Sequence, residues 1–170
     1  MRDFKVIGLM SGSSLDGVDI AYVNFSHDNK TWFFQIVEAG NVPYSEYWKE
    51  QLSLAFNKDK EELKELDKEY GRYLGTITQK FIKKYDMEPK LIASHGHTIF
   101  HRPEEGFTLQ IGDGQEIANA TGIMTINDFR TEDVEKVGQG APLVPIGDRH
   151  LFAEYPICLN IGGIANVSYE

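Results

Sequence analysis

The stretch Gly8-Leu9-Met10-Ser11-Gly12-Ser13-Ser14-Leu15-Asp16-Gly17-Val18-Asp19 stands between two apolar runs that favour β-strands. Residues 4–7 precede it, and residues 20–25 follow it. Two such runs joined by a short Gly/Ser turn predict a β-hairpin. The three glycines of the stretch allow a tight turn and a close approach of another backbone or of a ligand.

The side chains of this turn suggest a nucleotide site. The hydroxyls of Ser11, Ser13 and Ser14, together with exposed N–H groups, would suit phosphate oxygens. The carboxylates of Asp16 and Asp19 would repel a polyphosphate unless Mg²⁺ lay between them. The turn is not a P-loop, because no Gly-Lys-Ser/Thr ends it and no helix follows. The alternative is an ordinary hairpin whose glycines and serines only form the turn.

The length and composition of the chain exclude several classes of protein. The chain has 170 residues, enough for one domain with a sizeable core. Its formal net charge of -9 argues against a nucleic acid or an anionic membrane surface as partner, since both attract basic proteins. The single cysteine, Cys158, excludes an internal disulfide and fits a reducing compartment. With no signal peptide and no apolar run as long as a membrane span, we expect a cytoplasmic protein.

The first half of the chain predicts an α/β fold. A third strand over residues 31–39 follows the hairpin, so three antiparallel strands are expected before any helix, whereas a Rossmann domain enters a helix after its first strand. Ser45 is placed to cap a short helix, and Asp59 with Glu62 has the spacing of a capping box. A longer amphipathic helix then carries an apolar stripe at three- and four-residue steps, formed by Leu63, Leu66, Tyr70, Leu74, Ile77, Phe81 and Tyr85.

A histidine-rich run follows the strand predicted over residues 90–94. His95 and His97, two apart on one strand, would face the same side, and with His101 they allow a zinc site of a metallohydrolase. No acidic or cysteine ligand lies close by in sequence, which favours instead a polar strand end whose histidines bond to the backbone. A third interpretation is a substrate-binding edge, because open α/β sheets bind ligands at the ends of parallel strands.

A second polar strand end comes later. A strand over residues 107–111 leads to a helix capped by Asp113 and ended by Gly122. A buried strand is predicted over residues 123–126, and Asn127-Asp128-Phe129-Arg130 follows it. Asp128 and Arg130 therefore indicate either a second part of a site or a local salt bridge.

The C-terminal part combines a loop with another hairpin. Residues 138–145, including Gln139 and Gly140, have little side-chain bulk and would border a ligand or simply connect elements. A short helix is predicted over residues 147–154. Strands over 156–161 and 164–169, separated by Gly162-Gly163, repeat the design of the opening hairpin.

Six segments, taken in order, resemble one family. They are Gly8–Asp19, Ser94–His101, Thr108–Asp113, Asp128–Arg130, Gly138–Pro145 and Asn160–Asn166. This series is similar to the anhydro-N-acetylmuramic acid kinases, bacterial sugar kinases with the ribonuclease H-like fold of actin and hexokinase ATPases. The resemblance covers essentially the whole chain but only the N-terminal half of the family. It implies an N-terminal actin-like lobe over residues 1–155 and the first hairpin of a second lobe over residues 156–170.

The resemblance also implies ligands and sites. ATP and Mg²⁺ would be used to open the ring of 1,6-anhydro-N-acetylmuramic acid with water and to phosphorylate O6, in cell-wall recycling. The residues that would hold the ATP phosphates are Ser11, Gly12, Ser13, Ser14, Leu15, Asp16, Gly17, Val18, Asp19, Gly162 and Gly163, with Mg²⁺ bound through water to Asp16 or Asp19. The residues that would face the sugar are His95, His97, Asp128, Arg130, Gln139 and Gly140.

Two expectations concern the chain by itself. The family's catalytic aspartate lies in an Asp-Thr-Gly-Pro segment that this sequence lacks, so we expect the base beyond Glu170 and no kinase activity from these 170 residues alone. The terminal apolar strand would pair with a second copy or become disordered. The alternative from another class is a non-catalytic module that binds a sugar or a partner protein at the same edge.

Overall fold

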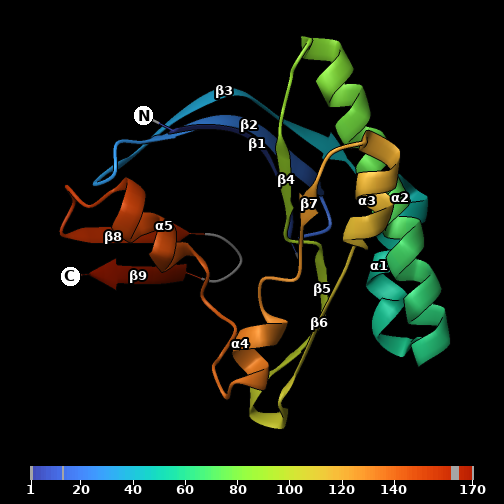
Figure 1. Ribbon diagram of the computed structural model, residues 1–170. Helices are drawn as coiled ribbons and strands as arrows, with labels where there is room; N and C mark the ends of the chain where they lie inside the picture. The colour runs from blue at the N-terminus through green and yellow to red at the C-terminus, as the bar shows by residue number, and fades with distance from the viewer. Residues whose placement is uncertain (1, 13, 162–164, 170) are drawn as a thin grey trace.

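The computed structural model describes residues 2–12, 14–161 and 165–169, and it has an α/β architecture built on a mixed five-stranded sheet. The sheet order is β3-β2-β1-β4-β7 (Figure 1). β1 (Arg2–Ser11), β2 (Gly17–His27) and β3 (Trp32–Pro43) pair antiparallel, and β4 (Leu91–Ser94) and β7 (Thr125–Ile126) extend the sheet in parallel with β1. The α/β class expected from the sequence is therefore confirmed.

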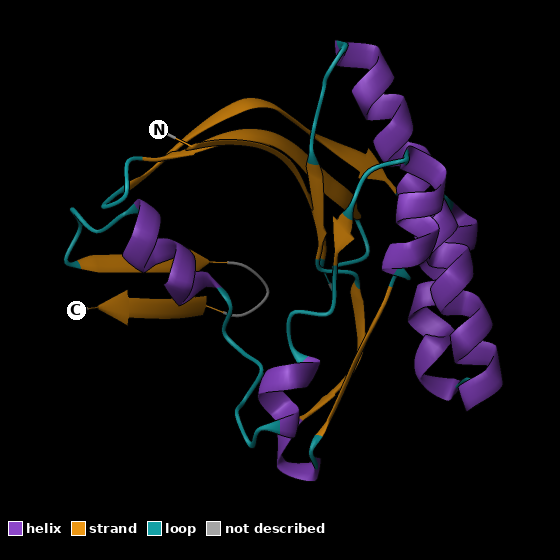
Figure 2. Ribbon diagram, viewed as in Figure 1, coloured by secondary structure: helices purple, strands orange, loops and turns teal. Residues whose placement is uncertain are grey.

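Helices α1 (Glu46–Leu54), α2 (Lys60–Tyr85) and α3 (Gly114–Thr121) lie together beside the sheet (Figure 2), with the 3-10 turn η1 (Ala55–Asn57) after α1. The predicted capping box is confirmed: the Asp59 carboxylate accepts from the Glu62 N–H at 3.0 Å, and the Glu62 carboxylate accepts from the Asp59 N–H at 2.9 Å. Asp113 and Gly122 also cap α3 as expected. These ends are set by local sequence, because each satisfies backbone groups that a helix leaves unpaired.

The core lies between α2 and the sheet. Five residues of the predicted stripe are buried, namely Leu66, Tyr70, Leu74, Ile77 and Phe81. They pack with buried sheet residues such as Ile7, Ile20 and Ile92. Burial of this apolar surface supplies most of the driving force for folding and fixes β1 and β4 with their C-terminal ends beside each other.

The histidine run does not continue β4. Gly96 has φ +72° and separates β4 from β5 (His97–Arg102), which pairs with β6 (Phe107–Ile111) in a separate small sheet closed by η2 (Pro103–Glu105). The prediction that His95 and His97 face one side of a single strand is therefore wrong. A left-handed backbone at Gly96 ends the alternation of faces on which it rested.

The strand predicted over residues 123–126 is shorter and more exposed than expected. β7 has two residues, and Ile126 is 46% exposed. It is the last strand at one side of the sheet, and no other described strand pairs with its outer side.

The C-terminal part contains α4 (Thr131–Glu135), α5 (Val144–Leu151), β8 (Ile157–Ile161) and β9 (Ala165–Tyr169). The helix predicted over 147–154 begins earlier, since Pro145 favours the first helical turn. β8 and β9 pair antiparallel, as predicted, and Phe34 of β3 meets Phe152 edge-to-face at 5.6 Å between ring centroids. Among the described residues, no helix is long and apolar enough to cross a membrane.

Candidate functional site

Three polar groups lie at one edge of the sheet because β1, β4 and β7 run parallel. β1 ends at Ser11, β4 at Ser94 and β7 at Ile126, and polar side chains follow each of these ends. The carboxyl ends of parallel strands are where open α/β sheets bind ligands. The fold therefore brings together three candidate segments that lie far apart in the sequence: the opening turn and the two strand ends after residues 94 and 126.

The turn between β1 and β2 combines an inward hydroxyl with outward carboxylates. Ser11 is 3% exposed, and its Oγ donates to the Gly96 carbonyl at 2.9 Å, so this hydroxyl belongs to the interior. Ser14 is exposed, and its Oγ donates to Asp16 Oδ1 at 2.8 Å. Leu15 adopts a left-handed φ of 56°. Ser13 lies outside the described residues.

The base of the turn is tied to β3. Gly17 and Val18 are buried, and a side chain at Gly17 would overlap the backbone of β3. Asp19 is exposed, and its Oδ1 accepts from Asn41 Nδ2 at 2.9 Å. Among the described residues, Ser14 alone lies within 4 Å of an added Cβ at Gly12, which is partly exposed. The base of the turn is thus closely packed against β3, whereas Gly12 has open space around it.

The two carboxylates suit a magnesium ion held together with phosphate. Within the described part of the chain, each uses one oxygen for a neutral donor and has no hydrogen-bond partner on the other. No group of three His, Cys, Asp or Glu residues there could hold a metal by itself. Mg²⁺ is commonly bound by one or two carboxylates, waters and substrate phosphates rather than by a full protein cage, so Asp16 and Asp19 fit that ion.

Behind the turn lies a buried group of hydroxyls. The hydroxyl oxygens of Tyr44 and Tyr70 are 2.5 Å apart, and both also interact with the Ser11 hydroxyl. Burial raises the pKa of Tyr44 and of Tyr70, so both remain neutral donors at physiological pH. They connect the long helix α2 to the last residue of β1, and no sequence pattern indicates this connection.

His95 is held at both ring nitrogens. Its Nδ1 lies 2.9 Å from the Gly96 carbonyl oxygen, which can only accept, so Nδ1 carries the hydrogen. Nε2 then accepts from Arg130, whose Nε and Nη2 lie at 3.0 and 2.8 Å. Burial, and next to it the Arg130 charge, lowers the pKa of His95. The imidazole is therefore neutral and in one tautomer.

Arg130 continues this chain of contacts to the loop after α4. Its Nη1 donates to the Gly140 carbonyl at 2.6 Å, and the Gly140 N–H donates to Asp133 Oδ2 at 2.6 Å. Gly140 is buried with φ +63°, whereas Gln139 is exposed. Because Ser11 and His95 both bond to the Gly96 carbonyl, one network joins the opening turn to the loop around Gly140. Asp133 also belongs to this network, although no sequence pattern indicates it.

Asp128 and Arg130 do not form the local salt bridge that was one of the two hypotheses for this pair. No ion pair within 4.0 Å among the described residues includes either side chain. Asp128 has φ +56°, and its Oδ1 accepts from the Thr131 N–H at 3.3 Å, at the start of α4. It is exposed at the same edge of the sheet, where its role as a sugar ligand stays a prediction.

The zinc interpretation is wrong on geometry. His97 is 5% exposed and lies edge-on to Tyr70, with ring centroids 6.4 Å apart, while His101 bonds through Nδ1 to Thr108 Oγ1 at 3.1 Å. His95 is occupied by Arg130 and Gly96. Burial lowers the pKa of His97 to about 4, so this ring is neutral in the interior. It lines a small hollow of about 180 Å³ with Leu15 of the opening turn.

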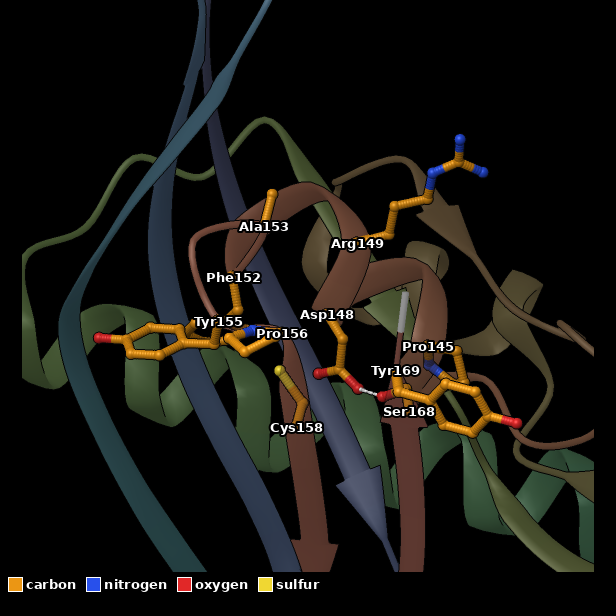
Figure 3. Close-up of a pocket in the computed structure, with 10 residues that line it drawn as sticks. All are labelled: Pro145, Asp148, Arg149, Phe152, Ala153, Tyr155, Pro156, Cys158, Ser168 and Tyr169. Atoms are coloured by element: carbon orange, nitrogen blue, oxygen red, sulfur yellow. Dashed lines mark hydrogen bonds between the residues drawn. The ribbon is translucent and has the colours of Figure 1, made fainter.

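A separate cavity of about 200 Å³ lies between α5 and the β8–β9 hairpin (Figure 3). In it, Ser168 Oγ donates to an Asp148 oxygen, and Cys158 lines the wall. It shares no residue with the network at the sheet edge. The hairpin also carries exposed apolar side chains that do not line this cavity, and Ile157, Leu159, Ile161 and Val167 are each more than half exposed. Gly162 and Gly163, predicted to contact phosphate, lie outside the described residues.

Comparisons with known proteins identify the family of the chain. A family model described as "AnmK: Anhydro-N-acetylmuramic acid kinase" matches residues 4–169. Curated relatives named anhydro-N-acetylmuramic acid kinase include those of Shewanella halifaxensis (strain HAW-EB4), 42% identical over 99% of this chain and 48% of the relative, and Pasteurella multocida (strain Pm70), 39% identical over 95% of this chain and 45% of the relative. The chain spans about half the length of the curated relatives it matches.

Proposed function

This chain belongs to the anhydro-N-acetylmuramic acid kinase family, and from that premise we propose that it supplies the phosphate- and sugar-binding edge of an ATP-dependent sugar kinase. The observation that carries the proposal is the meeting of the opening turn with the ends of β4 and β7 at one edge of the sheet. In this proposal the sheet has the ribonuclease H-like topology of actin-type ATPases, for which antiparallel pairing of β1 with β2 and β2 with β3 is support.

The opening turn would hold the ATP phosphates. Gly12 is partly exposed, and the strands on both sides of the turn are paired with each other, which supports an anion contact here. Asp16 and Asp19 would hold Mg²⁺ through water. When bound, Mg²⁺ would neutralise charge on the phosphate oxygens. By the same family resemblance, Gly162 and Gly163 would belong to a second phosphate-binding loop.

The sugar would lie over the ends of β4 and β7. Arg130, Asp128 and the loop of Gln139 and Gly140 are candidates for its polar contacts. Phosphoryl transfer depends on positioning and on charge stabilisation, which here begin with the fixed network between Ser11 and Gly140. The acceptor would be 1,6-anhydro-N-acetylmuramic acid, opened by water and phosphorylated at O6.

We propose that the complete reaction needs a second part of the protein. Residues 1–155 would form the first lobe and residues 156–170 the first hairpin of a second one. The exposed apolar face of β8 and β9 supports this division, because such a face is normally covered. By themselves the 170 residues should turn nothing over, and the uncovered hairpin should either pair with a second copy or become disordered.

Titration of the isotope-labelled chain with Mg-ATP and with the anhydro-sugar tests the proposal. We expect the sugar to shift amide signals at the ends of β4 and β7, and Mg-ATP to shift signals around Gly12 more weakly. The double variant Asp16→Asn with Asp19→Asn should abolish the effect of Mg²⁺ on the nucleotide titration. Asp28→Asn, in the next turn of the chain, serves as control. Sugar shifts with no nucleotide shifts at any concentration would favour a non-catalytic sugar-binding module instead. Steady ADP release by the 170-residue chain would contradict the need for a second part.

A further inference from the structure

One buried residue contacts both ends of the opening turn. Tyr44 follows directly after β3, and its backbone N–H donates to the carbonyl of Asp16, at the end of the turn, at 3.3 Å. Its phenol interacts with the hydroxyl of Ser11, the last residue of β1, at the start of the turn. Because Tyr44 is 4% exposed, both contacts are made from the interior of the protein.

A second tyrosine carries this contact into the long helix α2. The hydroxyl oxygens of Tyr44 and Tyr70 are 2.5 Å apart, and Tyr70, which is fully buried, also interacts with the Ser11 hydroxyl. Both rings belong to the main core, together with buried residues of the sheet and of α2. The tyrosine pair, Tyr44 and Tyr70, therefore connects the start of the turn to the most deeply buried part of the molecule.

The hydrogen atoms of these three hydroxyls point in one direction. The Gly96 carbonyl can only accept, so the Ser11 hydroxyl gives its single hydrogen to that oxygen, at 2.9 Å. Ser11 can then only accept from the tyrosine pair. One phenolic hydrogen joins the two tyrosines, and the other is the donor available to Ser11. Ser11 has no hydrogen left for a phosphate oxygen, and it is buried.

The far side of the turn is held by packing. Leu15 has a left-handed φ of 56°, which is unfavourable for leucine, yet its side chain packs against the core cluster. Gly12, by contrast, is partly exposed with open space around it. The backbone N–H groups that would meet phosphate therefore follow directly after Ser11, and their direction depends on how Ser11 is held.

We propose that Tyr44 and Tyr70 are positioning residues for the phosphate contact: by holding Ser11 and Asp16, they set the direction of the backbone at Gly12 before an anion binds. The proposal rests on the function proposed above, and it makes Ser11 a part of this support and not a phosphate ligand. A turn that is already ordered loses less entropy on binding. The apparent affinity for nucleotide falls in proportion to the fraction of molecules in which the turn is correctly arranged.

The experiment measures the order of the turn and the affinity for Mg-ATP in the full 170-residue chain. Backbone nitrogen relaxation reports on the Gly12 N–H without ligand, and amide shifts report on the titration with Mg-ATP. In Tyr70→Phe and in Tyr44→Phe the order parameter of Gly12 should fall toward the flexible range, about 0.6. The apparent Kd for Mg-ATP should rise by about five- to tenfold, the factor that corresponds to one buried hydrogen bond. If Tyr70→Phe folds poorly, Tyr44→Phe removes the same bond.

Two control variants separate positioning from a general loss of stability. Tyr73 lies on the same helix, its ring stacks on Tyr70 with centroids 5.9 Å apart, and its hydroxyl makes no hydrogen bond to the described residues. Tyr73→Phe should therefore leave both measurements unchanged. Asp59→Ala removes the capping box at the other end of the contact between α2 and solvent, and it should lower stability without moving either measurement. Equal effects in Asp59→Ala and Tyr70→Phe would contradict the positioning role.

A double variant tests the role of Ser11. If Ser11 acts together with the tyrosine pair, Ser11→Ala should loosen Gly12 in the absence of ligand, and Ser11→Ala with Tyr70→Phe should weaken Mg-ATP binding no more than either change alone. If Ser11 is instead a phosphate ligand, Ser11→Ala should weaken binding while Gly12 stays ordered, and the two changes should add. The second result would overturn the inference.

The remaining outcomes distinguish the inference from the function on which it rests. Unchanged order at Gly12 and unchanged Mg-ATP affinity in both tyrosine variants would overturn the inference and leave the proposed function standing. A loosened turn in these variants, without any Mg-ATP shift around Gly12 in the wild type, would support the tyrosine pair as the device that orders the turn and contradict the proposed phosphate contact.

Discussion

The buried imidazole of His97 should make stability depend on pH in a defined window. The perturbation is His97→Gln, which removes the titrating group and keeps a polar side chain. His97 is 5% exposed, and burial lowers its pKa to about 4. In the unfolded chain the pKa returns to about 6.5. Between these two values the unfolded state binds more protons than the folded state, so folding becomes less favourable as pH falls.

The magnitude follows from the two pKa values. The full difference corresponds to about 3 kcal/mol, reached only below about pH 4. Between about pH 7.5 and about pH 5.5 the contribution of His97 changes by about 1.4 kcal/mol. Conditions closer to the isoelectric point near 5.0 are avoided, because low net charge promotes precipitation. The lowered pKa of His95 acts in the same direction, so the prediction concerns the difference between wild type and variant.

The assay is urea unfolding followed by circular dichroism at both pH values. Wild type should lose about 1.4 kcal/mol more free energy of unfolding than His97→Gln over this interval, whatever the constant offset caused by the substitution. His150→Gln, at an exposed histidine, should behave like wild type. If His97→Gln folds poorly, His97→Leu provides the same comparison. Parallel pH dependence in wild type and both His97 variants would refute the reasoning.

Three further substitutions test the framework of the site, each by urea unfolding. Gly17→Ala should cost about 2 kcal/mol of unfolding free energy because the new Cβ overlaps the backbone of β3. Gly8→Ala should change stability by less than about 0.5 kcal/mol, since beyond its chain neighbours no atom of the described residues lies within 4 Å of the new Cβ. Similar costs for both variants would contradict the argument from close packing. Asp59→Ala should cost about 1 kcal/mol through loss of the capping box, and no loss would mean that the α2 terminus is held by packing alone. Tyr70→Phe should cost about 1–2 kcal/mol by removing the partner of the buried Tyr44 hydroxyl, and a neutral result would show that Tyr44 finds another one.

The parts of the fold that the sequence predicts are those set by near neighbours. The Asp59 capping box, the Asp113 cap and the stripe of α2 depend on residues three or four positions apart, and all are found. The β1–β2 pairing likewise follows from two apolar runs joined by a short turn. In each case the physical cause, a capped N–H group or a repeating apolar face, lies within one element.

The errors have a common cause in tertiary context. Gly96 looks like any residue of a polar strand end, but its left-handed backbone, set by packing against β6, places His95 and His97 in different surroundings. The exposure of β7 depends on its place at the edge of the sheet, which no local pattern carries. The contact of His95 with Arg130 joins residues 35 positions apart, and neither residue type indicates such a partner.

The Gly96 carbonyl links the separate parts of the candidate site through hydrogen bonds. It accepts from Ser11 at the end of β1 and from His95 after β4, so the two strand ends cannot shift independently without breaking one of these bonds. Through His95 the same constraint reaches Arg130 and then the Gly140 loop. Breaking one of these bonds would leave a donor of Ser11 or His95 unpaired in the interior, at a cost of about 1–3 kcal/mol, and this favours a single arrangement of the turn and the guanidinium. The strand ends that would meet phosphate and sugar are therefore held as one unit before any ligand binds, and this reduces the ordering that binding would otherwise require.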